Sequence, residues 1–200
     1  MKSPRYYSRM AKTVVGRGGN LPHWTQTCAT FVTFRLADSL PQSKLATYNA
    51  ERDSWLADHA EPWADDVRAE YNKLFPKRLQ RWLDAGYGSC VLREDAIRRI
   101  MEDCLRHFSD IRYSLYAYVV MPNHVHVLFM PEEGFDGRMI VRNWKSYTAK
   151  AIDLKLGRVG TVWQKESYDH LVRDVNEFNA CRNYIRQNNP ALAFDAYAMM

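Results

Sequence analysis

Apolar residues recur along this chain with two different spacings. Short runs rich in β-branched and aromatic residues predict strands, which cover residues 29–35, 113–120 and 124–130. Apolar positions three and four apart, separated by charged residues, predict helices, which cover residues 94–108, 137–156 and 174–188. Two or three further helices are expected between residues 41 and 85, and a short strand near Trp163.

The order of these elements indicates the fold class. Strand, helices, strand, strand, helix, short strand and helix form an α+β arrangement, compatible with a ferredoxin-like antiparallel sheet backed by helices on one face. We expect one domain over residues 29–190, with residues 41–88 as a helical insertion after the first strand. A basic N-terminal arm over residues 1–28 and a short C-terminal tail over residues 191–200 would flank this domain.

The composition is that of a single globular domain. The chain has 200 residues, of which 46% are hydrophobic, and this is enough to bury one core. It contains no apolar run near the roughly 18 residues of a membrane span, so we expect no membrane association. The four cysteines are scattered and form no CxxC pair, which argues against a zinc knuckle or a disulfide framework. Reduced thiols and a cytoplasmic location fit this pattern best.

Charge is distributed unevenly along the chain. The formal net charge is +5, and no acidic residue precedes Asp38. We therefore expect the N-terminal arm to be disordered or to touch DNA. Positive charge of this kind favours a polyanionic partner, although on charge alone ordinary solubility explains it equally well.

Residues 119–129 combine an apolar run with two histidines. His124 and His126 are two apart, and alternate side chains of a strand share a face. Both imidazoles should therefore project from the same side of one strand. Imidazoles are the commonest metal ligands, so the pair is a candidate metal site; a structural or surface role is the alternative.

The predicted final helix carries a second group of polar candidates. Asp174 can cap this helix, with Glu177 at the capping-box position. Its core face is predicted to contain Val175, Phe178, Cys181 and Ile185. Tyr184 and Asn188 are four apart and share one side of the helix. If the helix packs beside the histidine strand, Asn188 can complete a metal site and Tyr184 can reach a phosphate held there.

The histidine segment resembles the HUH motif, histidine–hydrophobic–histidine, of single-strand DNA endonucleases. With Met-Pro-Asn at residues 121–123 before it, the segment is most similar to the REP-associated tyrosine transposases and their insertion-sequence relatives. Residues 183–190, Asn-Tyr-Ile-Arg-Gln-Asn-Asn-Pro, are similar to the Tyr-Ile-x-x-Asn-Pro signature around that family's catalytic tyrosine. Further similarity covers residues 31–40, 144–150, 163–166 and 169–174, and it is weak over residues 41–85.

The resemblance implies that Tyr184 is the catalytic nucleophile and that His124, His126 and Asn188 bind a metal ion. The family's polar ligand lies four residues after the tyrosine, which selects Asn188. This chain has one more residue before the proline than the usual signature. Counting back from the proline would therefore select Asn189 instead.

The chemistry of such a site explains why these residue types occur together. A tyrosine that cleaves DNA retains the phosphodiester energy in a covalent phosphotyrosyl link. Because a free phenol has a pKa of about 10, the attack depends on a divalent cation that withdraws charge from the scissile phosphate. Two imidazoles and one amide oxygen suit Mg²⁺ or Mn²⁺, and Mn²⁺ matches nitrogen ligands better. Zinc would also bind the histidines.

Basic and aromatic residues in the second half of the chain could contact nucleic acid. The candidates are Arg138, Arg142, Lys145, Lys150 and Arg173 for the phosphate backbone, and Trp144 and Trp163 for stacking on unpaired bases. In the alternative interpretation, Trp144, Thr148 and Ile152 form the buried stripe of an amphipathic helix, and the basic residues are its solvated face.

Together these features predict a metal-dependent, single-strand-specific DNA endonuclease or transposase. The resemblance implies cleavage beside hairpin-forming repeats, with Tyr184 joined to the 5′-phosphate. The alternative is a catalytically silent, domesticated protein that binds repeat DNA. The expected partner is single-stranded or hairpin DNA. The protein would be a monomer or a homodimer, in which Tyr184 serves the metal site of its own subunit or of its mate.

Overall fold

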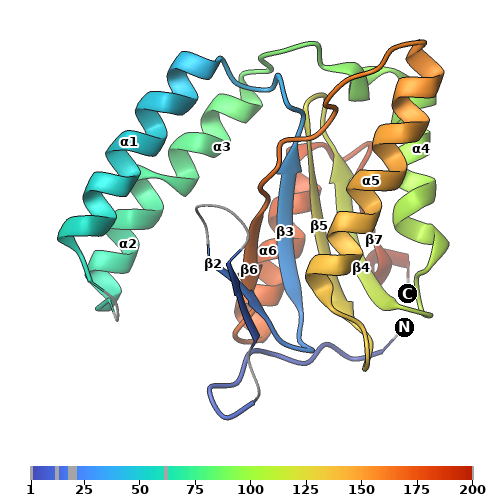
Figure 1. The fold of residues 1–200 in the computed structure, drawn as a ribbon. Coiled ribbons are helices and arrows are strands. Elements are labelled where there is room, and N and C mark those ends of the chain that lie inside the picture. Colours follow the sequence, from blue (N-terminus) through green and yellow to red (C-terminus); the bar gives the residue numbers. More distant parts are fainter. Residues whose placement is uncertain (1, 12–13, 18–21, 61–62, 200) are drawn as a thin grey trace.

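A computed structural model of the chain describes residues 2–11, 14–17, 22–60 and 63–199. Five strands in this part of the chain form an antiparallel sheet with the order β6-β3-β5-β4-β7 (Figure 1). They are β3 (Thr30–Arg35), β4 (Tyr113–Val120), β5 (His124–Pro131), β6 (Tyr168–Leu171) and β7 (Phe194–Asp195). The three long predicted strands are confirmed. The short strand predicted near Trp163 lies later in the chain, at β6, and Trp163 itself forms a single β-bridge with Leu36.

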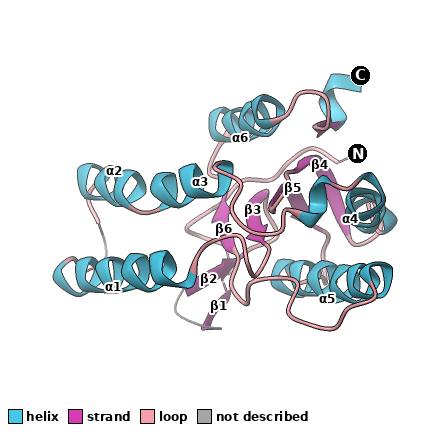
Figure 2. Ribbon diagram, turned by 90° about the horizontal axis from the view of Figure 1, so that it is seen from above, coloured by secondary structure: helices cyan, strands magenta, loops and turns pink. Residues whose placement is uncertain are grey.

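Helices cover both faces of the sheet (Figure 2). Two helices, α4 (Asp95–His107) and α5 (Gly137–Leu156), pack on one face, and α6 (Val175–Asn188) packs on the other. The chain order β3-α4-β4-β5-α5-β6, with sheet neighbours β6-β3-β5-β4, is that of a ferredoxin-like fold. The predicted fold class is confirmed. The expectation that helices cover one face alone is wrong, because α6 buries Phe178 and Ile185 against the second face.

The described residues between β3 and α4 form three α-helices, in agreement with the two or three that the sequence predicts. They are α1 (Gln42–Asp58), α2 (Asp65–Leu74) and α3 (Pro76–Asp84), which lie beyond the β6 edge of the sheet (Figure 1). Their aromatic side chains pack on one another, as Tyr48 does on Phe75 with ring centroids 5.9 Å apart. The short 3-10 helix η1 (Val91–Arg93) leads from this insertion to α4. Gly88, where the chain returns to the core, has a φ of +89°, and a Cβ there would collide with the Asp38 carbonyl.

Successive side chains of each strand point to opposite faces of the sheet and so form two separate apolar cores. Val32 of β3 and Val125 of β5 point toward α4 and α5. Phe31 points toward α6. His124 and His126 occupy the positions on β5 that alternate with the valines, so both lie on the α6 face.

The N-terminal arm is folded onto the domain. The backbone N–H of Ala29 donates to the Arg5 carbonyl at 2.7 Å. The arm continues into a hairpin of β1 (Val14–Arg17) and β2 (Pro22–Thr25). The expectation of a disordered arm is therefore wrong for residues 2–11, 14–17 and 22–28. Residues 1, 12–13 and 18–21 of the predicted arm lie outside the described residues. The alternative, that the arm touches DNA, stays a prediction.

The residues after 190 also belong to the domain. β7 pairs with β4, and a 3-10 helix, η2 (Ala196–Met199), follows it. The Arg182 guanidinium donates to the buried Asp195 carboxylate at 2.8 Å. The predicted domain boundary at residue 190 is therefore too early. No described helix is both long and apolar enough to cross a lipid bilayer.

Candidate active site

The two histidines of β5 face each other. His124 begins the strand directly after the turn at Pro122 and Asn123, and His126 follows two positions later. Both side chains are fully buried, and their Nε2 atoms lie 3.1 Å apart. The predicted placement of both imidazoles on one side of one strand is confirmed.

Neighbouring side chains orient both imidazole rings. Asn123 donates its Nδ2 to the carbonyls of Leu83 and Tyr87, each at 3.1 Å, so its Oδ1 is the atom that faces His124. His124 Nδ1 lies 2.8 Å from this oxygen and must donate to it, which leaves a lone pair on His124 Nε2. The Nδ1 atom of His126 lies 2.7 Å from the Thr33 hydroxyl. Such outer partners are typical of histidines that bind metal through Nε2.

Burial keeps both histidines neutral. It lowers the pKa of His124 to about 3. It also holds the pKa of His126 well below its ordinary value, and the neighbouring His124 adds to this effect. Neutral imidazole is the form that binds metal ions.

Helix α6 brings Tyr184 to the histidines. The helix begins with the predicted capping box, in which the Asp174 carboxylate accepts from the Glu177 N–H at 2.9 Å. Phe178 and Ile185 are buried, as predicted, but Val175 is 52% exposed and does not belong to the core face. The Tyr184 hydroxyl lies 3.5 Å from His126 Nε2.

Burial also keeps the Tyr184 phenol protonated. It raises the pKa of Tyr184 to about 12, although a hydrogen bond with the Asn188 side chain acts to lower this pKa; the charge of Asp84 acts to raise it. A phenol with this pKa is a weaker nucleophile than free tyrosine at neutral pH because less of it is ionised. An attack by this phenol would need compensating positive charge at the site.

The structure places Asn188 one turn beyond Tyr184 without a contact to a histidine. Its Nδ2 donates to the Tyr184 carbonyl at 2.8 Å, so the amide nitrogen is held by its own helix. Asn189, the alternative ligand, is the C-cap residue of α6. The sequence spacing is thus confirmed, whereas a role in metal binding stays a prediction for either residue.

Two residues of the insertion lie close to His124, and the sequence did not predict them. Gln80 Nε2 is 3.3 Å from His124 Nε2. Asp84 Oδ1 is 4.0 Å from the same nitrogen. No motif could have identified them, because 44 residues separate Gln80 from His124.

These groups fit a divalent ion with mixed nitrogen and oxygen ligands. Two adjacent ligands about 2.1 Å from one ion are about 3 Å apart, and the two Nε2 atoms are separated by 3.1 Å. Within the described residues, no group of three or more His, Cys, Asp or Glu is already arranged as a metal site. The remaining ligands would therefore be amide oxygens, water, substrate or a side chain that turns toward the ion.

A cavity beside these groups could hold a substrate. It has a volume of ≈ 430 Å³ and lies between the insertion and the α6 face of the sheet. Thr33, Gln80 and Tyr184 all line it. Its wall contains four basic side chains and one acidic one, which are Arg35, Arg52, Lys77, Lys165 and Glu166. Positive charge next to a tyrosine hydroxyl suits a phosphodiester.

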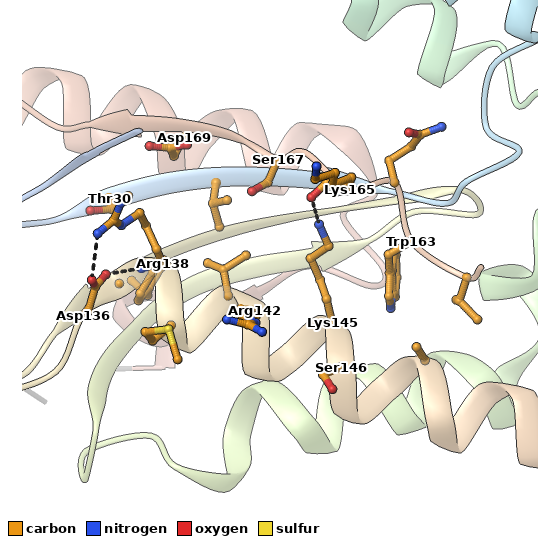
Figure 3. Close-up of a pocket in the computed structure, with 18 of the residues that line it drawn as sticks. Thr30, Asp136, Arg138, Arg142, Lys145, Ser146, Trp163, Lys165, Ser167 and Asp169 are labelled. Carbon is orange, nitrogen blue, oxygen red and sulfur yellow. Dashed lines mark hydrogen bonds and ion pairs between the residues drawn. The ribbon is translucent and has the colours of Figure 1, made fainter. Parts of the chain in front are cut away.

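A second cavity, of ≈ 740 Å³, lies on the opposite face of the sheet (Figure 3). Arg138, Arg142 and Lys145 of α5 line it, so the structure brings these three predicted DNA-contacting residues together. Lys150 and Arg173 are exposed but do not line this cavity.

The two tryptophans predicted to stack on bases are core residues. Trp144 is 3% exposed, and its Nε1 donates to the Tyr113 hydroxyl at 3.0 Å. Trp163 borders the second cavity but is only 5% exposed, and its Nε1 donates to Thr148 Oγ1 at 3.0 Å. The prediction of base stacking is wrong for both, because packing encloses their rings. The alternative, a buried stripe of Trp144, Thr148 and Ile152, is confirmed.

The part of the chain that holds this site matches a known family. A sequence profile described as "Transposase IS200 like" matches residues 87–188, just over half of the chain. The chain belongs to the IS200-like transposase family. The matched segment of this transposase includes β5 and α6, whereas α3 lies before the segment. Family membership makes the site described above the candidate active site of a DNA-cleaving enzyme.

Two solved structures are similar to this transposase. One is described as the REP-associated tyrosine transposase bound to a REP hairpin; it is 15% identical with a TM-score of 0.47, and the alignment covers 88% of this chain and 74% of that one. The other is a candidate transposase from Deinococcus radiodurans R1, 13% identical with a TM-score of 0.38, over 86% of this chain and 97% of that one. A comparison with curated proteins gives no significant match.

Proposed function

We propose that this transposase is a metal-dependent single-strand DNA endonuclease that cleaves beside hairpin-forming repeats through a covalent 5′-phosphotyrosine. One observation carries the proposal. The Tyr184 hydroxyl lies 3.5 Å from His126 Nε2, beside a pair of imidazole nitrogens that face each other. A nucleophile and a pair of metal-ligand nitrogens thus converge on one point.

In this proposal, His124 and His126 hold a divalent ion, Mg²⁺ or Mn²⁺, with Asn188 as a third ligand. The Asn188 nitrogen is bound to its own helix, which leaves the amide oxygen as the atom that could face the ion. When bound, the ion withdraws charge from the scissile phosphate and offsets the raised pKa of Tyr184. The burial of the histidines keeps their lone pairs available for it.

The reaction exchanges one phosphodiester bond for another. The phenolic oxygen of Tyr184 releases its proton to solvent water and forms a bond to the phosphorus. The bond from phosphorus to the 3′-oxygen breaks, and that oxygen leaves and takes up a proton from solvent water. The 5′-phosphate stays on the enzyme, which retains the bond energy for rejoining.

The DNA partner is proposed from charge and from the motif resemblance. Arg138, Arg142 and Lys145 would contact the phosphates of a hairpin at the second cavity. Tyr184 lies beside the histidines of its own chain, which supports cleavage within one subunit, whether the protein is a monomer or a homodimer.

Adduct formation tests this function. Purified protein and Tyr184→Phe are incubated with labelled single-stranded hairpin DNA, with Mn²⁺ or with a chelator, and resolved on a denaturing gel. We expect a covalent adduct that needs both the Tyr184 hydroxyl and the metal. If varied hairpins bind but none forms an adduct, the protein is instead a catalytically silent repeat-DNA-binding protein.

A further inference from the structure

We propose that the helical insertion completes the metal site, with Asp84 of α3 as a carboxylate ligand of the ion held by His124 and His126. The inference rests on the metal dependence proposed above and extends it. The family match begins at residue 87, so this ligand would come from outside the matched segment. The distances, the hydrogen bonding and the anchoring of α3 each support it.

The distances fit ligands of a common ion. Two ligand atoms about 2.1 Å from one ion are separated by about 3 Å when adjacent and about 4.2 Å when opposite. Asp84 Oδ1 lies 4.0 Å from His124 Nε2, close to the separation of opposite ligands. Asp84 is not yet in contact with the pair, but its side chain is 45% exposed and can turn without displacing core atoms.

The hydrogen bonds around His124 and Asp84 indicate that the position between these two side chains favours positive charge. His124 Nε2 presents a lone pair, because Nδ1 donates to Asn123. The Asp84 carboxylate is also an acceptor. The Gln80 amide nitrogen lies against both, at 3.3 Å from His124 and 2.8 Å from Asp84 Oδ1. Its N–H groups thus supply the partial positive charge that a cation would replace.

The backbone holds α3 at this position. Leu83 is 2% exposed, and its carbonyl accepts from the Asn123 side chain at 3.1 Å. Asn123 directly precedes His124, so the last turn of α3 is fixed to the residue next to the first metal ligand. Asp84 follows Leu83 directly in α3, so the same anchoring positions its side chain.

A carboxylate would change the character of the site. Two imidazoles and an amide form a neutral ligand set, whereas Asp84 would add one negative charge. Mg²⁺ and Mn²⁺ both favour oxygen ligands, and carboxylates above all. The insertion would therefore raise the affinity of the free protein for the ion before DNA binds.

Metal affinity, measured without DNA, tests the inference. Binding of Mn²⁺ to the full-length protein is followed by the loss of the free-ion electron paramagnetic resonance signal. We expect Asp84→Asn to raise the Kd for Mn²⁺ by roughly tenfold or more, in the range typical for loss of a supporting group at a metal site. His124→Ala should abolish binding. Asp103→Asn is the control, since it removes the same charge from α4 on the opposite face.

The outcomes separate this inference from the proposed function. If Asp84→Asn binds Mn²⁺ as tightly as the unaltered protein while His124→Ala does not bind, Asp84 is no ligand, and the histidine site stands without it. If the unaltered protein binds no Mn²⁺, both proposals fail. Thermal unfolding of each variant is the control for misfolding: a variant whose Kd changes should unfold at the same temperature as the unaltered protein.

Discussion

Lys145 shows how one residue can make DNA binding sensitive to pH. Burial lowers its pKa to about 8, against the opposing effect of Glu166. Its ammonium group donates to the Lys165 carbonyl at 2.9 Å, at the edge of the second cavity (Figure 3). A lysine with a lowered pKa is charged below that pKa and loses its charge as the pH rises through it.

We therefore expect hairpin-DNA affinity to fall as the pH is raised from about 7 to 9 at constant ionic strength. Lys145→Arg should remove this part of the pH dependence, since a guanidinium stays charged throughout the range. Fluorescence anisotropy of a labelled hairpin measures the affinity of the unaltered protein and of Lys145→Arg at each pH. An identical pH profile in Lys145→Arg would show that Lys145 does not contact the DNA.

Trp144 illustrates the limit of prediction for single residues. The same tryptophan fits an exposed stacking platform and a buried helix stripe, and the helical spacing is compatible with both. The partners that decide between them are Tyr113 and Phe129 of the sheet, whose rings lie 5.0 and 4.9 Å from the Trp144 ring. These partners come from other elements, so the sequence around Trp144 cannot identify them.

Among the secondary-structure elements, the short strand β7 has a larger structural role than its two residues suggest. Its Asp195 carboxylate is 4% exposed and accepts three hydrogen bonds from the Arg182 guanidinium of α6, at 2.8, 2.9 and 3.1 Å. This pair joins the last strand to the helix that carries Tyr184. A segment predicted to be a tail thereby supports the candidate active site.

Asp195→Ala should lower the free energy of unfolding by about 3–5 kcal/mol, because it leaves the mostly buried Arg182 charge without its partner. Urea unfolding at neutral pH measures the change. Glu133→Ala is a matched control: it removes an acid from the exposed pair with Arg5, and should cost less than about 1 kcal/mol. Equal losses in the two variants would contradict a structural role for the Arg182–Asp195 pair.

At the scale of the whole molecule, the two cavities described above lie on opposite faces of one sheet. Thr33 of β3 lines the cavity beside Tyr184, while Thr30 and Val32 of the same strand line the second cavity. Alternate side chains of a strand point to opposite faces, so the sheet itself separates the two sites. The proposed DNA binding by α5 and the proposed chemistry at Tyr184 should therefore respond to different substitutions.

Arg142→Gln should weaken hairpin binding and reduce the slope of log Kd against log salt by about 0.9, the value for one phosphate contact. Its Kd for Mn²⁺ should not change. Titrations at several salt concentrations measure the slope. If Arg142→Gln also altered metal binding, or left the slope unchanged, the two sites would not be separate in this way.

The sequence predicted the central features of the candidate site because they depend on local geometry. Strand alternation is enough to place His124 and His126 on one face, and helix spacing is enough to place Asn188 one turn from Tyr184. The order of elements was enough for the ferredoxin-like sheet. Val175 was wrongly assigned to the core because it lies in the first turn of α6, where the helix is not yet covered by the sheet.

The sequence by itself determined the histidine pair from alternation along one strand and the fold class from the order of the elements, and the resemblance over residues 183–190 singled out Tyr184 as the nucleophile candidate. Only the tertiary structure decided that α3 lies against His124, that residues 2–11 and 191–199 pack onto the domain, and that two tryptophans are enclosed. The Gln80–His124 contact spans 44 residues and the Tyr184–His126 contact spans 58. Contacts at such separations arise when whole elements bury their apolar faces together, which no local periodicity specifies.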